Sequence, residues 1–377
     1  MNAKKILMGL MLVMIFCGTS QADIVYTTST GNLGLFTISR NDDTLTITSP
    51  VLQYSGVGTN SLAASYWDGS NARLIVIDRT TDLTASSGDT ALIFSTGNLT
   101  EPLNTEKTTL TGAYNVQSVI NSYNGRGLFA ASRENASFIE FYTKDFSVGH
   151  SYVYEPESGD TEAAKAVNII ADIKNLYVLL NVGASKSLAM KFDGQLKKDI
   201  EGYVRVENDY AASLMGWLSN GRIAAAHSNG VDVLESGHFR RLMSFDVPVK
   251  TFCMDSGNGF YFEAQSGDVC GLYHYDHESA DVTPLRENMT GTRLQTLRDE
   301  SNNVLAAIIG GKILFYDMLN DTLAGEYDSS ALNGEPVSLA VPSASGDDGK
   351  RSSGCNLSGA GIILLSACVY CLKSKRR

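Results

Sequence analysis

The residues of this chain best suited to acid–base or metal chemistry are its histidines and the acidic side chains beside them. Among the five histidines, only two lie close together, in the segment His274-Tyr275-Asp276-His277-Glu278. Alternation along a β-strand would place His274 and Asp276 on one face, where they could hold a metal. His277 and Glu278 fall where a hairpin is expected, so we interpret the segment as a strand end and its turn.

The other motifs are too incomplete to predict catalysis. The sequence has no Gly-x-Ser-x-Gly elbow, no phosphate-binding loop and no His-Glu-x-x-His. The segments 41–43 and 320–321 resemble parts of calcium loops, but neither continues into the glycine and distal glutamate that such a loop needs. Both are typical of turns. We therefore predict no catalytic residue, no metal site and no bound cofactor.

Two of the six cysteines, Cys253 and Cys270, lie in the body of the chain, 17 residues apart. In an oxidising compartment such a pair is most simply a disulfide. The strands expected around them put Cys253 early in one strand and Cys270 at the end of a nearby loop. We predict a Cys253–Cys270 disulfide, which would stabilise the fold by roughly 3 kcal/mol.

The composition is typical of an all-β protein of strongly acidic charge. Glycine is abundant (35) and proline scarce (7), and long helical periodicity is almost absent. Between Asp23 and Gly349 the chain carries 41 acidic and 22 basic side chains, a net charge of −19. Such a body repels nucleic acid and anionic lipid, so we predict no nucleic-acid partner.

A unit of short strands recurs along the body. Each unit has two apolar strands joined by a tight turn, then a polar loop, a third strand and a polar hairpin. The first two strands are predicted at 61–64 with 74–78, 116–120 with 128–131, 167–170 with 176–180, 214–217 with 223–226, 252–254 with 260–262, and 294–297 with 304–307. The units start about 39 to 55 residues apart, the length of a four-stranded propeller blade. The body therefore resembles a β-propeller.

The strands left over at the two ends predict how the propeller closes. Residues 23–60 supply a second, third and fourth strand without a first, and a single strand remains at 336–341. Pairing them would close a ring of seven blades and remove the exposed sheet edges. We predict a seven-bladed propeller over residues 23–343. The alternative, a two-domain β-sandwich, does not account for leftover strands at both ends.

Residues 1–22 have the three parts of a secretory signal peptide. Lys4 and Lys5 give a positive start, and an apolar run of about eleven residues follows, short of the roughly 20 that a spanning helix needs. Small residues precede Asp23. We predict that signal peptidase cleaves between Ala22 and Asp23 and that the body is exported.

The C-terminal end predicts an attachment to the cell envelope. After a linker at 344–352 come Ser353-Gly354-Cys355-Asn356, an apolar run at 359–372 and a basic terminus. As a helix, the apolar run reaches about 21 Å, against a hydrocarbon core of about 30 Å. The basic terminus would stay cytoplasmic by the positive-inside rule, which leaves the body outside.

This tail, residues 353–377, is similar to the tripartite C-terminal sorting signals of bacterial surface proteins of the Synergist-CTERM type. The resemblance implies cleavage near the motif by an intramembrane sorting protease, with Cys355 a candidate for modification or attachment. Leu357-Ser358 and Ser366 depart from the pattern. The alternative is an ordinary single-pass membrane anchor.

In a propeller, ligands usually bind the face built from the loops that enter each first strand and those that join second to third strands. The predicted loops of this face are 79–90, 133–135, Lys186, 208–210 and 227–229. We expect an envelope-anchored binding module for an unknown extracytoplasmic protein, peptide or glycan. Two alternatives stay open: a propeller enzyme, lactonase-like or another hydrolase with a metal over the central channel, and a structural envelope component.

Overall fold

The computed structural model describes residues 20–67, 71–80, 88–104, 106–110, 118–122, 126–130, 138–142, 148–153, 164–171, 175–193, 204–255, 257 and 259–342. These residues are almost entirely β-strand, with one short helix, α2 (Ser329–Leu332). The predicted linker, the sorting tail and most of the signal peptide lie outside them. No helix among the described residues has the length and apolar character to cross a membrane.

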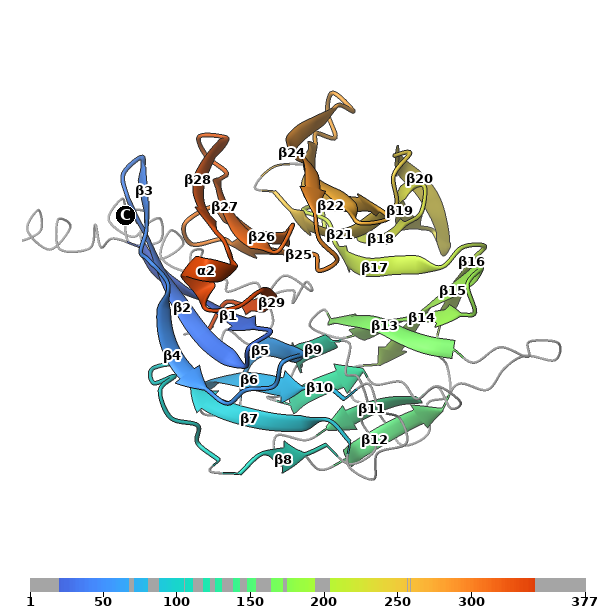
Figure 1. Cartoon of the computed structure of the whole chain (residues 1–377). Coiled ribbons are helices and arrows are strands. Elements are labelled where there is room, and N and C mark those ends of the chain that lie inside the picture. Colours follow the sequence, from blue (N-terminus) through green and yellow to red (C-terminus); the bar gives the residue numbers. More distant parts are fainter. Residues whose placement is uncertain are drawn as a thin grey trace, which may run out of the picture.

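Most of the chain forms antiparallel sheets of four strands that follow one another in sequence. Their strands are β5 (Ser61–Trp67), β6 (Ala72–Asp78), β7 (Thr90–Ser95) and β8 (Thr108–Thr109); β13 (Ala164–Ala171), β14 (Asn175–Val182), β15 (Lys186–Asp193) and β16 (Val204–Asn208); β17 (Ala212–Trp217), β18 (Ile223–His227), β19 (Gly230–Glu235) and β20 (His238–Ser244); β21 (Val249–Met254), β22 (Phe260–Ser266), β23 (Val269–Tyr275) and β24 (Val282–Thr290); β25 (Gln295–Asp299), β26 (Val304–Ile309), β27 (Lys312–Asp317) and β28 (Thr322–Tyr327). Figure 1 shows these sheets arranged as blades around a common centre, with the first strand of each innermost.

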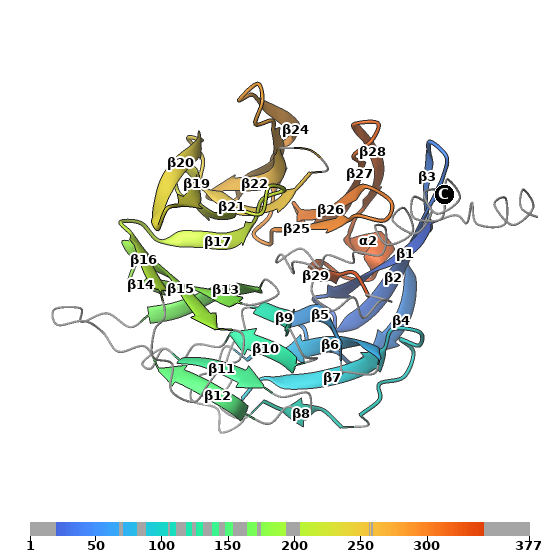
Figure 2. The same cartoon turned by 180° about the vertical axis from the view of Figure 1, so that it is seen from behind.

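One further sheet joins the two ends of the folded body, as the leftover strands predicted. It contains β29 (Pro336–Ala340), β1 (Ser20–Thr28), β2 (Asn32–Asn41), β3 (Thr44–Ile47) and β4 (Val51–Ser55). β29 pairs antiparallel with β1 from Val25 to Thr28, while β3 and β4 share the outer edge of β2. This closure is also visible from behind, in Figure 2, where β29 lies beside β1.

The protein is thus an all-β propeller, and six of its blades are sheets of four or more strands. The predicted number of seven is not confirmed by the described residues. Between β8 and β13 they contain two separate hairpins, β9 (Ser118–Ser122) with β10 (Arg126–Ala130), and β11 (Phe138–Tyr142) with β12 (Val148–Val153).

The burial of each strand follows from its place in the blade. In the blade β25–β28, every residue of the second strand, Val304–Ile309, is buried, because this strand packs against neighbouring blades on both faces. The outermost strand, Thr322–Tyr327, is mostly exposed. Strands buried on both faces read as continuous apolar runs instead of alternating ones. This is why the inner strands are the clearest signal in the sequence.

Side-chain amides bind the backbone of the neighbouring first strand and so hold adjacent blades together. Asn168 on β13 donates to Met215 O (2.6 Å) and accepts from Met215 N (3.0 Å). Gln295 on β25 makes the same pair of bonds to Leu339 on β29, at 3.0 and 2.8 Å. First strands have one edge without a strand partner, and buried backbone groups need hydrogen bonds. These amides supply them.

The predicted disulfide is wrong in this structure, where Cys253 and Cys270 are buried and not joined to each other. Cys253 is opposite Tyr261 on β22, and Cys270 is opposite Gln265, four residues away on that strand. The two cysteines are therefore separated by the whole width of β22, about 9.6 Å, and by about 13 Å along it. A disulfide needs Cα atoms within about 7 Å. β21 begins at Val249, so Cys253 is near the end of its strand and not early in it.

Candidate functional site on the loop face

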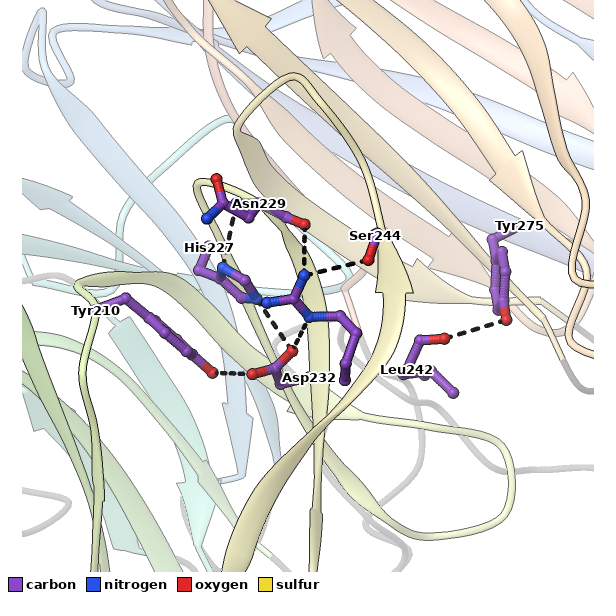
Figure 3. Close-up of polar contacts among 8 residues, drawn as sticks. Tyr210, His227, Asn229, Asp232, Leu242, Ser244 and Tyr275 are labelled. Atoms are coloured by element: carbon purple, nitrogen blue, oxygen red, sulfur yellow. Dashed lines mark hydrogen bonds and ion pairs between the residues drawn. The ribbon is translucent and has the colours of Figure 1, made fainter.

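We use the term loop face for the end of the propeller formed by the loops entering first strands and the loops joining second to third strands. In the blade β17–β20 the structure brings two of the predicted loops together there. Tyr210, in the loop entering β17, stacks its ring on His227 at the end of β18, with centroids 4.0 Å apart and planes at 22°. Figure 3 shows this pair with the polar groups around it.

A buried carboxylate, Asp232 on β19, is the centre of the site. Tyr210 Oη donates to Asp232 Oδ2 (2.6 Å), and Arg241 Nε on β20 donates to Asp232 Oδ1 (2.5 Å). His227 Nε2 is 3.1 Å from the same Oδ1 (Figure 3). The three partners come from a loop and two strands, so Asp232 links the loop entering β17 to β18 and β20.

The electrostatics of Asp232 follow from these contacts. Burial alone would raise the pKa of Asp232, but hydrogen bonds from His227, Tyr210 and Arg241 outweigh burial and lower this pKa to about 2. Burial and the bond to the Asp232 carboxylate both raise the pKa of the Tyr210 hydroxyl. Asp232 is therefore ionised and Tyr210 protonated at neutral pH.

His227 is fully buried, and both of its ring nitrogens have partners. Asn229 N–H donates to His227 Nδ1 (3.1 Å), which makes Nδ1 the acceptor and leaves the proton on Nε2, facing Asp232. A general base needs a free lone pair within reach of its substrate. This histidine has none, so the arrangement positions the loop and does not transfer protons.

The rest of the network extends the same support to the exposed tip of the loop. Arg241 Nη1 donates to Asn229 O (3.0 Å) and to Ser244 Oγ (3.2 Å). Ser228 and Asn229 are exposed. The backbone that presents these two residues is thus fixed from both sides, by His227 through Asn229 N–H and by Arg241 through Asn229 O.

Replacing Asp232 with asparagine is expected to destabilise the protein by about 2 kcal/mol at pH 7, because an amide cannot accept from all three donors. The folded pKa of about 2 is below the ordinary 3.8, so this contribution is present above pH 3.8 and disappears as the pH falls towards 2. Urea denaturation of both proteins from pH 7 to pH 3 measures it. The exposed Asp246→Asn is the control. Equal stability of D232N and wild type at pH 7 would contradict the role given to Asp232.

The sequence predicted the loops 208–210 and 227–229 as part of this face, but it did not indicate Asp232 and Arg241. The available signal was a charge inside an apolar strand, Val231-Asp232-Val233, where a buried carboxylate requires partners. Of the other predicted loops, 81–87 and 133–135 lie outside the described residues. Lys186 begins β15.

The histidine segment 274–278 behaves as the predicted strand end and turn. His274 Nε2 pairs with Asp255 Oδ2 (2.9 Å), at the end of the propeller opposite the loop face. Asp276 instead accepts from the backbone N–H groups of Glu278 and Ser279. Within the described part of the chain, no three or more His, Cys, Asp or Glu side chains are grouped as a metal would require.

No known protein family matches this sequence, and no curated protein matches it either. Solved protein structures do match the structure of this chain. A provisionally assigned 6-phosphogluconolactonase from Bacteroides fragilis aligns over 85% of this chain and 98% of its own, with a TM-score of 0.57 and 11% identity. A streptogramin B lyase aligns over 79% and 91%, with a TM-score of 0.53 and 10% identity. A protein of unknown function from Desulfotomaculum acetoxidans aligns over 85% and 98%, with a TM-score of 0.51 and 11% identity.

These proteins share its fold. At identities of 10 to 11% the likeness extends to the propeller architecture and no further. One fold of this kind carries unrelated functions, so the residues of the site decide the function.

Proposed function

We propose that this chain is an envelope-anchored, extracytoplasmic binding module that recognises a protein, peptide or glycan with its loop face. The observation that supports the proposal best is the network around Asp232. It fixes the exposed backbone of Ser228 and Asn229 without leaving a free base, which suits recognition better than catalysis. Rigid presentation lowers the entropic cost of binding.

The test measures binding of the purified full chain to fractionated envelope and extracellular material. The amount bound is compared between wild type and two matched variants. Ser228→Arg alters the loop face at an exposed position, and His277→Arg makes the same change at the exposed hairpin on the opposite end. We expect S228R to reduce binding at least tenfold and H277R to leave it unchanged. Equal loss in both variants, or none in either, would contradict the use of the loop face.

A propeller enzyme is the second candidate, because two of the structural neighbours carry the names of a lactonase and a lyase. In this reading a metal over the centre of the loop face would polarise the substrate. Thermal unfolding with chelator and with added divalent ions tests it. A rise in Tm with one divalent ion would favour the enzyme, whereas no response would leave the binding module as the better explanation. A structural envelope component would bind no ligand in either experiment.

We also propose seven blades, with the hairpins β9–β10 and β11–β12 forming one blade. In support, β10 lies against β11, and β9 lies between the first strands β5 and β13. If β10 and β11 pair, their amides at 126–130 and 138–142 should exchange with solvent as slowly as those of the other inner strands. Fast exchange in both would leave two separate hairpins.

For export, we propose that signal peptidase releases Asp23 as the mature N-terminus. Although β1 starts at Ser20, its pairing with β29 starts only at Val25, and Asp23 Oδ1 accepts from Thr37 Oγ1 (3.1 Å). Cleavage after Ala22 would therefore leave the pairing of β1 with β29 intact. N-terminal sequencing of the envelope-associated protein should return Asp23, and a sequence starting at Met1 would contradict the proposal.

For the tail, we propose that an intramembrane sorting protease processes it near Ser353-Gly354-Cys355-Asn356 and that the mature protein lacks 373–377. The apolar run is short for a lasting anchor but long enough to enter the membrane. Cys355→Ser should leave an unprocessed precursor or release the body from the envelope. Normal retention of this variant, together with a mature peptide that ends at Arg377, would instead indicate a plain membrane anchor.

A further inference from the structure

Three neighbouring first strands, β25, β29 and β5, start side by side on the loop face. The Gln295 side chain binds Leu339 on β29, and Ala63 N on β5 donates to Ser338 Oγ (3.0 Å), also on β29. These bonds hold Gln295, the first residue of β25, and Ala63, the third residue of β5, against the neighbouring residues Leu339 and Ser338 of β29. The residues just before β25 and β5 are held at this part of the rim.

An arginine lies at each end of this row. Arg293 precedes Gln295 by two residues. Arg79 follows β6 and bonds to Asn60, the residue before β5, through Nε to Asn60 O (3.0 Å) and through Nη2 to Asn60 Oδ1 (3.1 Å). Two guanidinium groups, from loops more than 200 residues apart, are thus brought to one part of the rim.

The two guanidinium groups are close enough for their charges to interact. Burial lowers the pKa of Arg79, the carboxylate of Asp89 opposes this, and the positive charge of Arg293 lowers the pKa further. Asp89 is buried, and its Oδ1 accepts from Thr80 N (2.7 Å). Asp89 therefore offsets part of the positive charge at Arg79.

One donor at this site lacks a partner. Arg293 Nη1 is inaccessible to solvent and has no hydrogen bond within the described part of the chain. A buried donor without a partner is costly, and a charged one more so. In a body of net charge −19, two arginines that repel each other and leave a donor unused are best explained by an anion that binds both.

We propose that Arg79 and Arg293 bind the oxyanion of a ligand, a carboxylate or phosphate group, at the loop-face start of β25, β29 and β5. Guanidinium groups present planar, paired N–H donors that match such oxygens. The inference rests on the proposed binding function and narrows it: the ligand recognised by the loop face carries an anionic group. An anion here would complete the hydrogen bonding of Arg293 and remove the repulsion between the arginines.

The experiment measures the Tm of the full chain with inorganic phosphate and, separately, with succinate, each against sodium chloride of equal ionic strength. A ligand that binds only the folded protein raises Tm. We expect a rise of about 1–2 °C with at least one of the two anions, which is what roughly 1 kcal/mol of stabilisation gives in a folded body of more than 300 residues. A rise with phosphate alone would indicate a phosphate group on the ligand, and a rise with succinate alone would indicate a carboxylate.

Arg293→Gln should abolish the rise, because it removes the charge and the unused donor but no side-chain hydrogen bond among the residues that the structure describes. Arg286→Gln is the matched control, since Arg286 is partly exposed and paired with Glu326 on the outer strands; it should keep the rise. If R293Q does not fold, Arg293→Lys is the alternative variant. It keeps the positive charge but loses the paired N–H donors of the guanidinium group, so it should at least halve the rise in Tm. An equal Tm in chloride, or a full rise in R293Q or R293K, would overturn the inference. If neither anion raises Tm but S228R still reduces binding and H277R does not, the anion site is rejected while the proposed binding function is still supported.

Discussion

Replacing Glu263 with methionine is expected to stabilise the protein by about 3 kcal/mol at pH 7, the opposite of what most core substitutions do. Glu263 is on β22, fully buried between two blades. Neither of its carboxylate oxygens has a hydrogen-bond partner within the described residues. Methionine has a similar length and a flexible apolar side chain, so it removes the unpaired oxygens without leaving a cavity.

The pH dependence of this gain follows from the same burial. Burial raises the pKa of Glu263 well above its ordinary 4.5. Below pH 4.5 the carboxyl is protonated in both the folded and the unfolded protein. Above pH 4.5 the unfolded chain loses this proton while the folded protein keeps it, so the folded state binds more protons and stability falls as the pH rises, by about 1.4 kcal/mol per unit. The fall ends at the folded pKa.

Urea denaturation of wild type and E263M at pH 4.5, 6 and 7.5 measures the effect. The gain should be smallest at pH 4.5 and grow with pH, whereas Glu326→Gln, at a partly exposed carboxylate paired with Lys312, should show no such growth. Glu263→Gln separates the two contributions: it should remove the pH dependence but retain part of the cost of a buried polar group. A loss of stability in E263M at pH 7.5 would show that Glu263 has an essential partner.

Replacing Arg40 with methionine is expected to destabilise the protein by about 3–5 kcal/mol, because it leaves the carboxylate of Asp317 buried without its counter-ion. Arg40 on β2 and Asp317 on β27 form a two-pronged ion pair, at 2.6 and 3.1 Å, between the closing blade and the blade before it. Their side chains are 8% and 5% exposed, so the pair is shielded from solvent and salt. Arg40 Nε also donates to Asn302 O (2.8 Å).

The pKa of Asp317 gives this prediction its pH window. Burial would raise the pKa of Asp317, but hydrogen bonds from Arg40 and Asn320 outweigh burial and lower it below 3.8. The stability from ionised Asp317 is therefore present above pH 3.8 and is lost as the pH falls below that value. The difference between wild type and R40M should shrink over the same range.

A second variant separates the cost of burying the Asp317 charge without its counter-ion from the cost of losing the arginine side chain. Adding Asp317→Asn to Arg40→Met removes the charge but keeps an acceptor for Leu319 N, which bonds to Asp317 Oδ1 at 3.0 Å. We expect the double variant to recover at least half of the stability that R40M loses in urea denaturation. If R40M costs less than about 1 kcal/mol, the ion pair does not hold the closing blade.

The sequence by itself determined the strand content, the blade repeat and the way in which the ring closes. Inner strands such as Val304–Ile309 are apolar throughout because both of their faces are covered, and this pattern is local enough to read. The unpaired strand at 336–341 predicted its partner at the other end of the body, and β29 does pair with β1. Closure was predictable because each end of the all-β body has a strand edge without a partner, and pairing the two edges with each other covers both.

Only the tertiary structure decided which polar groups meet. Arg40 and Asp317 are 277 positions apart, and Asp232 collects partners from a loop and two strands, so no local pattern marks either contact. The cysteine pair shows the same limit: closeness in sequence suggested a bond, but β22 lies between β21 and β23 and keeps the sulfurs apart. Apolar burial is set residue by residue along a strand, whereas polar partners depend on how neighbouring strands and blades are aligned.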